Sequence, residues 1–297
     1  GGPADVLVRA IRCVDSRIIT STSAGVVEVW SASTFKSLAT LTGDAGTAWA
    51  LCVVTSDGSN RLLSGGGSDD FVVLLHDLGT AWGGASVPPT REYRGHRTDI
   101  SIIIELSGGR FASGSRDDSI RIWALESGAC LATLRGHGNS VYGLVAIEGD
   151  KLVSCSFDCT LVVWDTRTYA AVATIEMSSP VHSLVRRPDG TFLSGHSDGA
   201  VRLCDLNEAK PTAWLRGHAA DKIMWVLALL PDGRLVSGGC DGTLRIWDVA
   251  ARACLGVITA HTEIWSCCLL PDGGLAVGCK GGTVLVLGFA WSRRSAA

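Results

Sequence analysis

The stretch "SGSRDDSIRIWALESGACLATLRGH", residues 113 to 137, decides the fold. Apolar and polar residues alternate through "SIRIWAL", which is the pattern of a half-buried β-strand. A second apolar run, "CLATL", follows, and the stretch closes on a Gly-His pair. The same features return at regular offsets along the chain, so the stretch predicts one unit of a repeat rather than an isolated motif.

The last core position of the "SIRIW"-like strand occurs seven times, at intervals of 40 to 47 residues. The next Gly-His slot lies 14 residues after this position, except in the second repeat, where the count is 20. The core positions are Trp30, His76, Trp123, Trp164, Cys204, Trp247 and Leu287. The expected repeats cover roughly residues 5–43, 44–95, 96–136, 137–177, 178–217, 218–260 and 261–297.

Each repeat contains four short strands. In the fourth repeat they are "NSVYGLVAI", "KLVSCS", "TLVVWDT" and "AAVATI", and Asp, Gly, Ser or Pro-Asp-Gly marks the turns. No segment sustains a 3.6-residue period, so helix should be nearly absent. Four antiparallel strands repeated seven times predict an all-β fold, a single seven-bladed β-propeller over residues 1–297.

The pattern "GH…LVSGGCDGTLRIWD" resembles the WD40 repeat family, and the resemblance covers essentially the whole chain. It implies a buried hydrogen-bonded set of His, Ser, Asp and Trp in each full repeat. Such a set is physically reasonable, because a buried Asp needs donors and His, Ser and Trp supply them. Three copies at repeat spacing favour this structural role over a hydrolase triad. The sets are His96, Ser113, Asp117, Trp123; His137, Ser154, Asp158, Trp164; and His218, Ser237, Asp241, Trp247.

The other four repeats are degraded in different ways. We expect repeats one, five and seven to be held mainly by apolar packing. The fourth strand of blade seven also has no good candidate, since the chain ends on "SRRSAA". By register, the closing strand would lie upstream of residue 1, so blade seven is expected to have three strands and an exposed edge. The altered slots hold Thr20, Ala24, Asp44, His76, Ser178, Cys204, Val277, Gly281 and Leu287.

The resemblance implies that partners bind the face formed by the first-strand entrances and the second-to-third-strand turns. Aligning the first strands puts Val8 of repeat one in the entrance row, beside several aromatic residues. Trp, Tyr and Arg most often anchor interfaces, because they bury much area with few torsions. The alternative is that the rings only fill the channel. The candidate partner-binding residues are Trp49, Tyr142, Phe157, His182, Trp225, Trp265, Arg116 and Lys280.

These features indicate a non-catalytic interaction scaffold for a protein or peptide partner, and two narrower functions stay open. One is a methyl-lysine or histone-peptide reader, with Asp69, Asp99 and Glu263 supporting a cation in an aromatic cage. The other is a ubiquitin-binding propeller or a ubiquitin-ligase substrate receptor. For this, the last repeat, "EIWSCCLLPDGGLAVGCKGGTVLVL", resembles the last blade of phospholipase-A2-activating-type propellers, a ubiquitin-binding family.

An insertion of six residues lengthens "LGTAWGGASVPPTREY" in the second repeat. It joins the third and fourth strands, so it should emerge on the opposite face. Trp82, flanked by Gly-Gly and Pro-Pro, suits either a solvated loop or a secondary docking element.

Composition narrows the remaining function classes. The net charge of −3 argues against binding to nucleic acid or a membrane surface through bulk charge. No apolar run reaches the ~18 residues that suggest a membrane span. The eleven Cys form no C-x-x-C, and no enzyme motif occurs, so we expect no metal, no cofactor and no catalysis. Reduced Cys suit a cytoplasmic or nuclear protein. The "GGPAD" start suggests a monomeric propeller within a larger protein.

Overall fold

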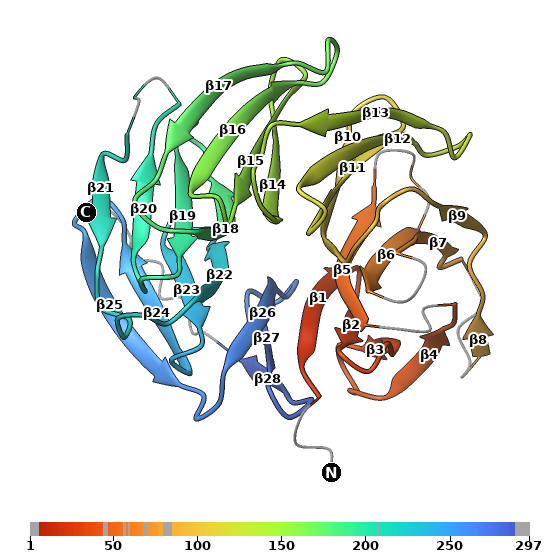
Figure 1. Cartoon of the computed structure of the whole chain (residues 1–297). Helices are drawn as coiled ribbons and strands as arrows, with labels where there is room; N and C mark the ends of the chain where they lie inside the picture. Colours follow the sequence, from red (N-terminus) through yellow and green to blue (C-terminus); the bar gives the residue numbers. More distant parts are fainter. Residues whose placement is uncertain are drawn as a thin grey trace.

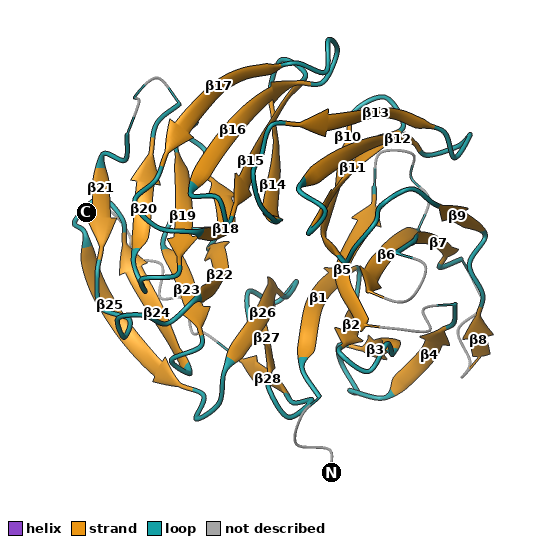
Figure 2. Ribbon diagram, viewed as in Figure 1, coloured by secondary structure: helices purple, strands orange, loops and turns teal. Residues whose placement is uncertain are grey.

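The chain folds into a ring of seven β-sheets that surround a common axis like blades (Figure 1). The computed structural model describes residues 6–43, 47–55, 58, 60–67, 71–79, 85–206, 208 and 210–288. Within these ranges there are strands and turns but no helix (Figure 2). The all-β propeller predicted from the repeats is confirmed.

The blades follow one another in chain order, and within each blade the strands run antiparallel from the axis outward, apart from one parallel strand at the outer edge of blade one. Blade one contains β1 (Val8–Val14), β2 (Arg17–Thr22), β3 (Val27–Ser31), β4 (Ser37–Leu41) and β8 (Ala85–Val87). Blade two contains β5 (Thr47–Val54), β6 (Arg61–Gly67), β7 (Val73–Asp77) and β9 (Arg91–Tyr93). Blade three contains β10 (Ile100–Leu106), β11 (Arg110–Ser115), β12 (Ser119–Ala124) and β13 (Cys130–Arg135).

The remaining blades repeat this order. Blade four contains β14 (Val141–Ile147), β15 (Lys151–Ser156), β16 (Thr160–Asp165) and β17 (Ala171–Glu176). Blade five contains β18 (Val181–Arg186), β19 (Phe192–His196), β20 (Val201–Cys204) and β21 (Ala213–Leu215). Blade six contains β22 (Met224–Leu229), β23 (Leu235–Gly239), β24 (Thr243–Asp248) and β25 (Ala253–Thr259). Blade seven contains β26 (Ile264–Leu269), β27 (Leu275–Cys279) and β28 (Val284–Leu287).

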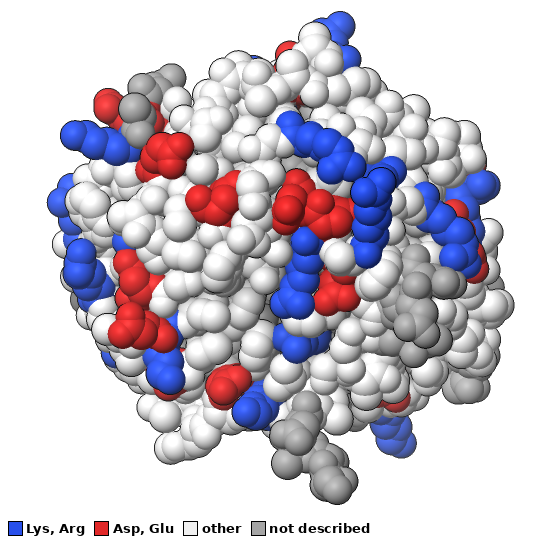
Figure 3. All heavy atoms as spheres, in the orientation of Figure 1, with Lys and Arg blue, Asp and Glu red and all other residues white. Residues whose placement is uncertain are grey.

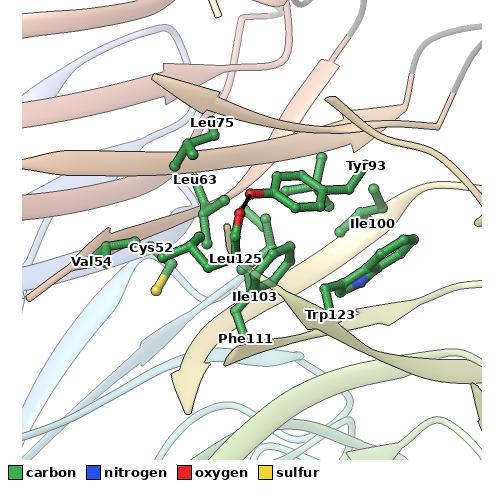
Figure 4. Close-up of a cluster of buried hydrophobic side chains, with 12 residues drawn as sticks. Cys52, Val54, Leu63, Leu75, Tyr93, Ile100, Ile103, Phe111, Trp123 and Leu125 are labelled. Carbon is green, nitrogen blue, oxygen red and sulfur yellow. Dashed lines mark hydrogen bonds between the residues drawn. The ribbon is translucent and has the colours of Figure 1, made fainter. Parts of the chain in front are cut away.

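Apolar side chains between adjacent blades form the core. Figure 4 shows one such layer, where Tyr93 of blade two meets Phe111 and Trp123 of blade three. The Tyr93 and Phe111 rings meet edge to face with centroids 4.7 Å apart. The Tyr93 hydroxyl donates to the Leu125 carbonyl oxygen at 2.7 Å, so the buried hydroxyl does not lack a partner. Each blade therefore depends on its neighbour for a complete core.

The complete repeats contain a polar relay in place of a cluster around the Asp. In the third repeat, Trp123 Nε1 donates to Ser113 Oγ at 2.9 Å. Ser113 Oγ lies 2.7 Å from His96 Nε2, and His96 Nδ1 lies 2.9 Å from the Asp117 carboxylate. The Asp117 carboxylate is thus hydrogen-bonded to His96 but not to Ser113 or Trp123, which it contacts only indirectly, through the His96 ring. The same relay joins His137, Ser154, Asp158 and Trp164, and also His218, Ser237, Asp241 and Trp247.

The relay also explains the Gly of the Gly-His pair. A Cβ added at Gly136 would lie 2.9 Å from the Trp164 ring, and one at Gly217 would lie 3.0 Å from the Trp247 ring. The backbone passes so close to the indole that only Gly fits without displacing it.

The fifth repeat differs from the expectation of apolar packing alone. His196 lies at the end of β19 and is fully buried, 2.8 Å from Ser194 Oγ and 3.1 Å from the Ser179 carbonyl oxygen. Beside it, Arg202 forms an ion pair with Asp198. The fifth blade therefore contains a substitute network, in which the His comes from its second strand instead of the preceding loop.

Blade seven has three strands, as the sequence predicted. Among the described residues no strand pairs with the outer edge of β28. The ring closes instead through the start of the chain. The amides of Gly281 and Gly282 donate to the Val6 carbonyl oxygen at 2.7 Å, and Ser266 Oγ donates to the Val8 carbonyl oxygen at 3.1 Å. A closing strand upstream of residue 1 stays a prediction.

The insertion of the second repeat crosses to the neighbouring blade. Its end forms β8, which pairs in parallel with β4 through Ala39–Ala85, Thr40–Ser86 and Leu41–Val87. β8 thereby covers the outer edge of blade one, since the edge amide of Thr42 donates to the Val87 carbonyl oxygen. The described end of this segment is therefore a strand that covers a blade edge. Trp82 lies outside the described residues.

Candidate partner-binding site at the channel mouth

The first strand of every blade contains a β-bulge at the same place. Pairing with the second strand slips by one residue, as between Val141 and Gly143 in blade four. A bulged residue is unpaired, so its side chain is redirected out of the regular alternation. The bulged residues are Arg9, Trp49, Ser101, Tyr142, His182, Trp225 and Trp265.

All seven bulged side chains line one cavity of about 220 Å³ at the centre of the ring. The bulge is therefore the local feature that builds the site, because it turns one side chain per blade toward the axis. The small residues after several bulges, such as Ala10, Ala50 and Gly143, also line the cavity and leave room for the large rings.

The aromatic rings touch one another around the mouth. Trp225 and Trp265 stack with centroids 4.9 Å apart and planes 23° apart. Tyr142 meets Trp225 edge to face at 5.7 Å, and Phe157 lies 6.5 Å from Tyr142. The structure thus brings these predicted residues together as one arc over blades four to seven.

The entrance residue of blade one is Arg9, and the prediction of Val8 from the sequence is wrong. Val8 is 1% exposed and packs in the core, whereas Arg9 is the bulged residue. The guanidinium carbon of Arg9 lies 3.7 Å from the centre of the Trp49 ring and 4.3 Å from that of Trp265. Aligning the first strands by their apolar residues puts Val8 in the entrance row. In every blade, however, a buried apolar residue comes directly before the bulged residue, and in blade one this pattern identifies Arg9 as the bulged residue.

His182 belongs to the cluster but is buried, with 4% exposure. Its Nε2 lies 2.7 Å from Ser197 Oγ, and its ring lies between Tyr142 and Trp225 at centroid distances of 5.0 and 4.7 Å. Burial lowers the pKa of His182 to about 4, so the ring is neutral at physiological pH. The His182 ring therefore packs against the neighbouring rings and presents little surface of its own.

Charged side chains surround the rings in pairs. Arg116 lies 3.2 Å from Asp99 and 4.5 Å from the Trp49 ring centre, and Lys280 lies 3.7 Å from Glu263. Figure 3 shows that acidic and basic side chains are interspersed over the face it presents, with no broad region of one sign. The predicted cation-supporting acids Asp99 and Glu263 are therefore already paired, and Asp69 lies outside the described residues.

Comparison with known proteins shows which family has this repeat and this fold. The model for the WD40 family, "WD domain, G-beta repeat", matches residues 88–124, 128–165, 209–248 and 252–286. The chain belongs to the WD40 repeat family. The WD40 propeller domain of Doa1, a solved structure, superposes with a TM-score of 0.83 at 25% identity, covering 100% of this chain and 97% of that one. Propellers of this family typically bind protein partners.

Curated relatives share parts of the chain. WD repeat-containing protein 18 of Bos taurus is 30% identical over 127 residues, which is 40% of this chain and 28% of the relative. Mitochondrial division protein 1 of Eremothecium gossypii is 26% identical over 219 residues, 70% of this chain and 27% of the relative. The chain thus spans less than a third of the length of these two relatives.

The described ranges also bear on metal binding, membrane insertion and thiol chemistry. They contain no group of three or more His, Cys, Asp or Glu placed to hold a metal ion, and no helix with the length and hydropathy to span a membrane. All eleven Cys are free thiols. Burial raises the pKa of Cys52 to about 11 and that of Cys267 to about 12, which keeps these thiols protonated and poorly nucleophilic.

Proposed function

We propose that this propeller is a non-catalytic interaction scaffold that binds an extended segment of a protein partner across the channel mouth. One observation carries the proposal. The Trp residues of the three complete relays are each 1% exposed, whereas the indoles of Trp49, Trp225 and Trp265 are only half-buried. Rings that served only to fill the core would be covered like the first group. Half-buried stacked rings instead present flat apolar area to a partner.

The contact set follows from exposure and position. Phe157 is 42% exposed beside Tyr142, and the Lys280 side chain is 43% exposed at the blade-seven rim. These residues extend the aromatic arc outward and give it a basic end. We assign partner contacts to Trp49, Tyr142, Phe157, Trp225, Trp265, Arg116 and Lys280, and a supporting role to His182.

A methyl-lysine reader is less well supported. Such a site needs an aromatic cage open to a cation. Here the guanidinium of Arg9 already lies between Trp49 and Trp265, and its charge would repel a second cation. Ubiquitin binding depends on the last repeat's resemblance, and no feature of the channel mouth selects ubiquitin over another protein. Ubiquitin is therefore one defined ligand in the test below.

The test compares affinity capture by three purified forms of the full chain. They are the wild type, the Trp225→Ala/Trp265→Ala double variant, and Trp214→Ala. Trp214 is a matched control, because it is 45% exposed on the outer strand β21 and away from the mouth. Bound proteins are quantified by mass spectrometry, with added free ubiquitin measured in parallel. Partners should be lost from the double variant and kept by the control. Equal capture by all three forms would refute the proposal.

A further inference from the structure

Arg9 forms no ion pair with an acidic side chain among the described residues, although it lies at the channel mouth. Arg116 forms an ion pair with Asp99, and Lys280 forms one with Glu263. Within the described part of the chain, Arg9 Nε and Nη1 are buried and donate to no hydrogen-bond acceptor. A buried guanidinium normally satisfies its donors with a carboxylate or carbonyl oxygen, so the two unsatisfied donors indicate that an acceptor is missing here.

The surroundings of Arg9 favour an anion. The described lining of the cavity contains Arg9 and Arg12 but no Asp or Glu. The Trp49 and Trp265 rings lie against the Arg9 guanidinium, with their centres 3.7 and 4.3 Å from its central carbon, so apolar surface borders the cation. Burial and the nearby charge of Arg116 lower the pKa of Arg9 to about 10, yet it remains a cation at neutral pH. An incoming negative charge would offset both effects.

We propose that the channel mouth binds a carboxylate of the partner, an Asp or Glu side chain, on the guanidinium of Arg9. This rests on the proposed function and specifies the chemistry of its ligand. Arg116 and Lys280 are already in ion pairs, whereas Arg9 presents a positive charge with two unpaired N–H donors, which match the two oxygens of a carboxylate. A phosphate group would bring almost two negative charges close to Asp99 and Glu263. The indoles on either side would take apolar residues next to the acid.

The test is a selection from a random peptide library displayed on phage, with the wild-type chain as bait. Selected peptides should share one Asp or Glu flanked by apolar residues. Changing that Glu to Gln in a synthetic peptide should lower affinity by about tenfold or more, because a charge-assisted bond becomes a neutral one. This arm leaves the protein untouched, so it holds even if a variant folds poorly.

The protein side of the test uses Arg9→Gln, with Arg135→Gln as the control. Arg135 is exposed on the outer strand β13. In Arg9→Gln the acidic and neutral peptides should bind with equal affinity, while Arg135→Gln should still prefer the acidic peptide. A library without a shared acid, an acid whose removal has no effect, or a preference that needs a phosphorylated residue would overturn the proposal.

The two proposals can fail separately. If Trp225→Ala/Trp265→Ala abolishes peptide binding while Glu→Gln in the peptide does not change it, the binding arc stands and the carboxylate assignment is wrong. If the double variant also binds normally, the channel mouth is not the partner site.

Discussion

In each complete repeat, one carboxylate accepts hydrogen bonds from several directions at the end of a buried relay. Asp158 accepts from His137, from the Gly138 amide, and from the amide and hydroxyl of Thr160. Burial alone would raise the pKa of Asp158, but these hydrogen bonds outweigh it and hold the pKa below its ordinary value of 3.8. The contribution to stability is therefore present above about pH 4 and is lost as the pH falls further.

Asp158→Ala should lower the free energy of unfolding by about 2–4 kcal/mol, because His137 and the Gly138 amide lose their acceptor in a covered site. Asp189→Ala is the comparison, since that carboxylate is 49% exposed in a turn, and it should cost less than about 1 kcal/mol. Urea unfolding of both variants measures the difference. Equal losses would mean that the relay contributes no more than a surface turn.

Buried neutral histidines should make stability depend on pH. Burial, together with the charge of Arg202, lowers the pKa of His196 to about 4 from an ordinary 6.5. The unfolded chain therefore binds more protons between pH 6.5 and 4, and stability must fall as the pH is lowered through this range. Between pH 7.5 and 5 the loss from His196 is about 2 kcal/mol. His196→Gln should reduce the pH dependence by that amount in urea melts at the two values, and an unchanged dependence would contradict it.

At the scale of single residues, the sequence showed the relay members because the spacing of Ser, Asp and Trp is the same in all three complete repeats. It did not show Arg9, because one residue of slip in a bulge is invisible to an alignment of apolar positions. It also did not show His196, since a His on the second strand has no counterpart in the family pattern. Both residues depend on geometry that only the assembled blade provides.

At the scale of strands, β28 is the exposed edge of the ring. It pairs with β27 on one side, while its counterpart β24 pairs with both β23 and β25. Amides of β28 should exchange with deuterium much faster than those of β24, because strands bonded on one side open at lower cost. Native-state hydrogen exchange measures this directly. Similar protection in the two strands would show that a further segment pairs with β28.

The other blades indicate what β28 would accept. In every complete blade, the third-strand residue equivalent to Val284 pairs with a large apolar residue of the fourth strand. Leu41, Tyr93 and Leu134 are three examples. The described lining of the groove beside β28 is mostly apolar and includes Trp30 and Phe35. A fourth strand would place such a residue there. The sequence predicted the missing strand from spacing, but it could not predict that β8 leaves blade two to cover the edge of blade one.

At the scale of the whole molecule, the fold was predictable because seven copies of one weak pattern reinforce each other. The closure was not, because it depends on contacts between residues that lie at opposite ends of the chain. Arg9 and Trp265 lie on the two sides of this junction and touch across it. The candidate site therefore includes the seam of the ring.

Trp265→Ala should separate binding from folding. Partner affinity should fall roughly thirtyfold, which corresponds to about 2 kcal/mol for a lost hot-spot ring. Unfolding free energy should fall by less than about 2 kcal/mol, because the indole is only half-buried. Trp247→Ala, which empties a fully buried site in the adjacent blade, should cost about 3–5 kcal/mol. Comparable destabilisation by both variants, with partner binding intact, would make Trp265 a core residue.

The seven bulges have a consequence for how such a molecule can diversify. A bulged residue has no partner in the strand ladder, so its side chain can change without altering the backbone hydrogen bonds that hold the blade. In this chain the same backbone position already holds one cation, one hydroxyl, one imidazole and four larger rings. The ring therefore has seven equivalent positions around one cavity at which the side chain can vary. Substitutions at these positions, one blade at a time, can change which ligand is bound while the backbone of the propeller stays the same.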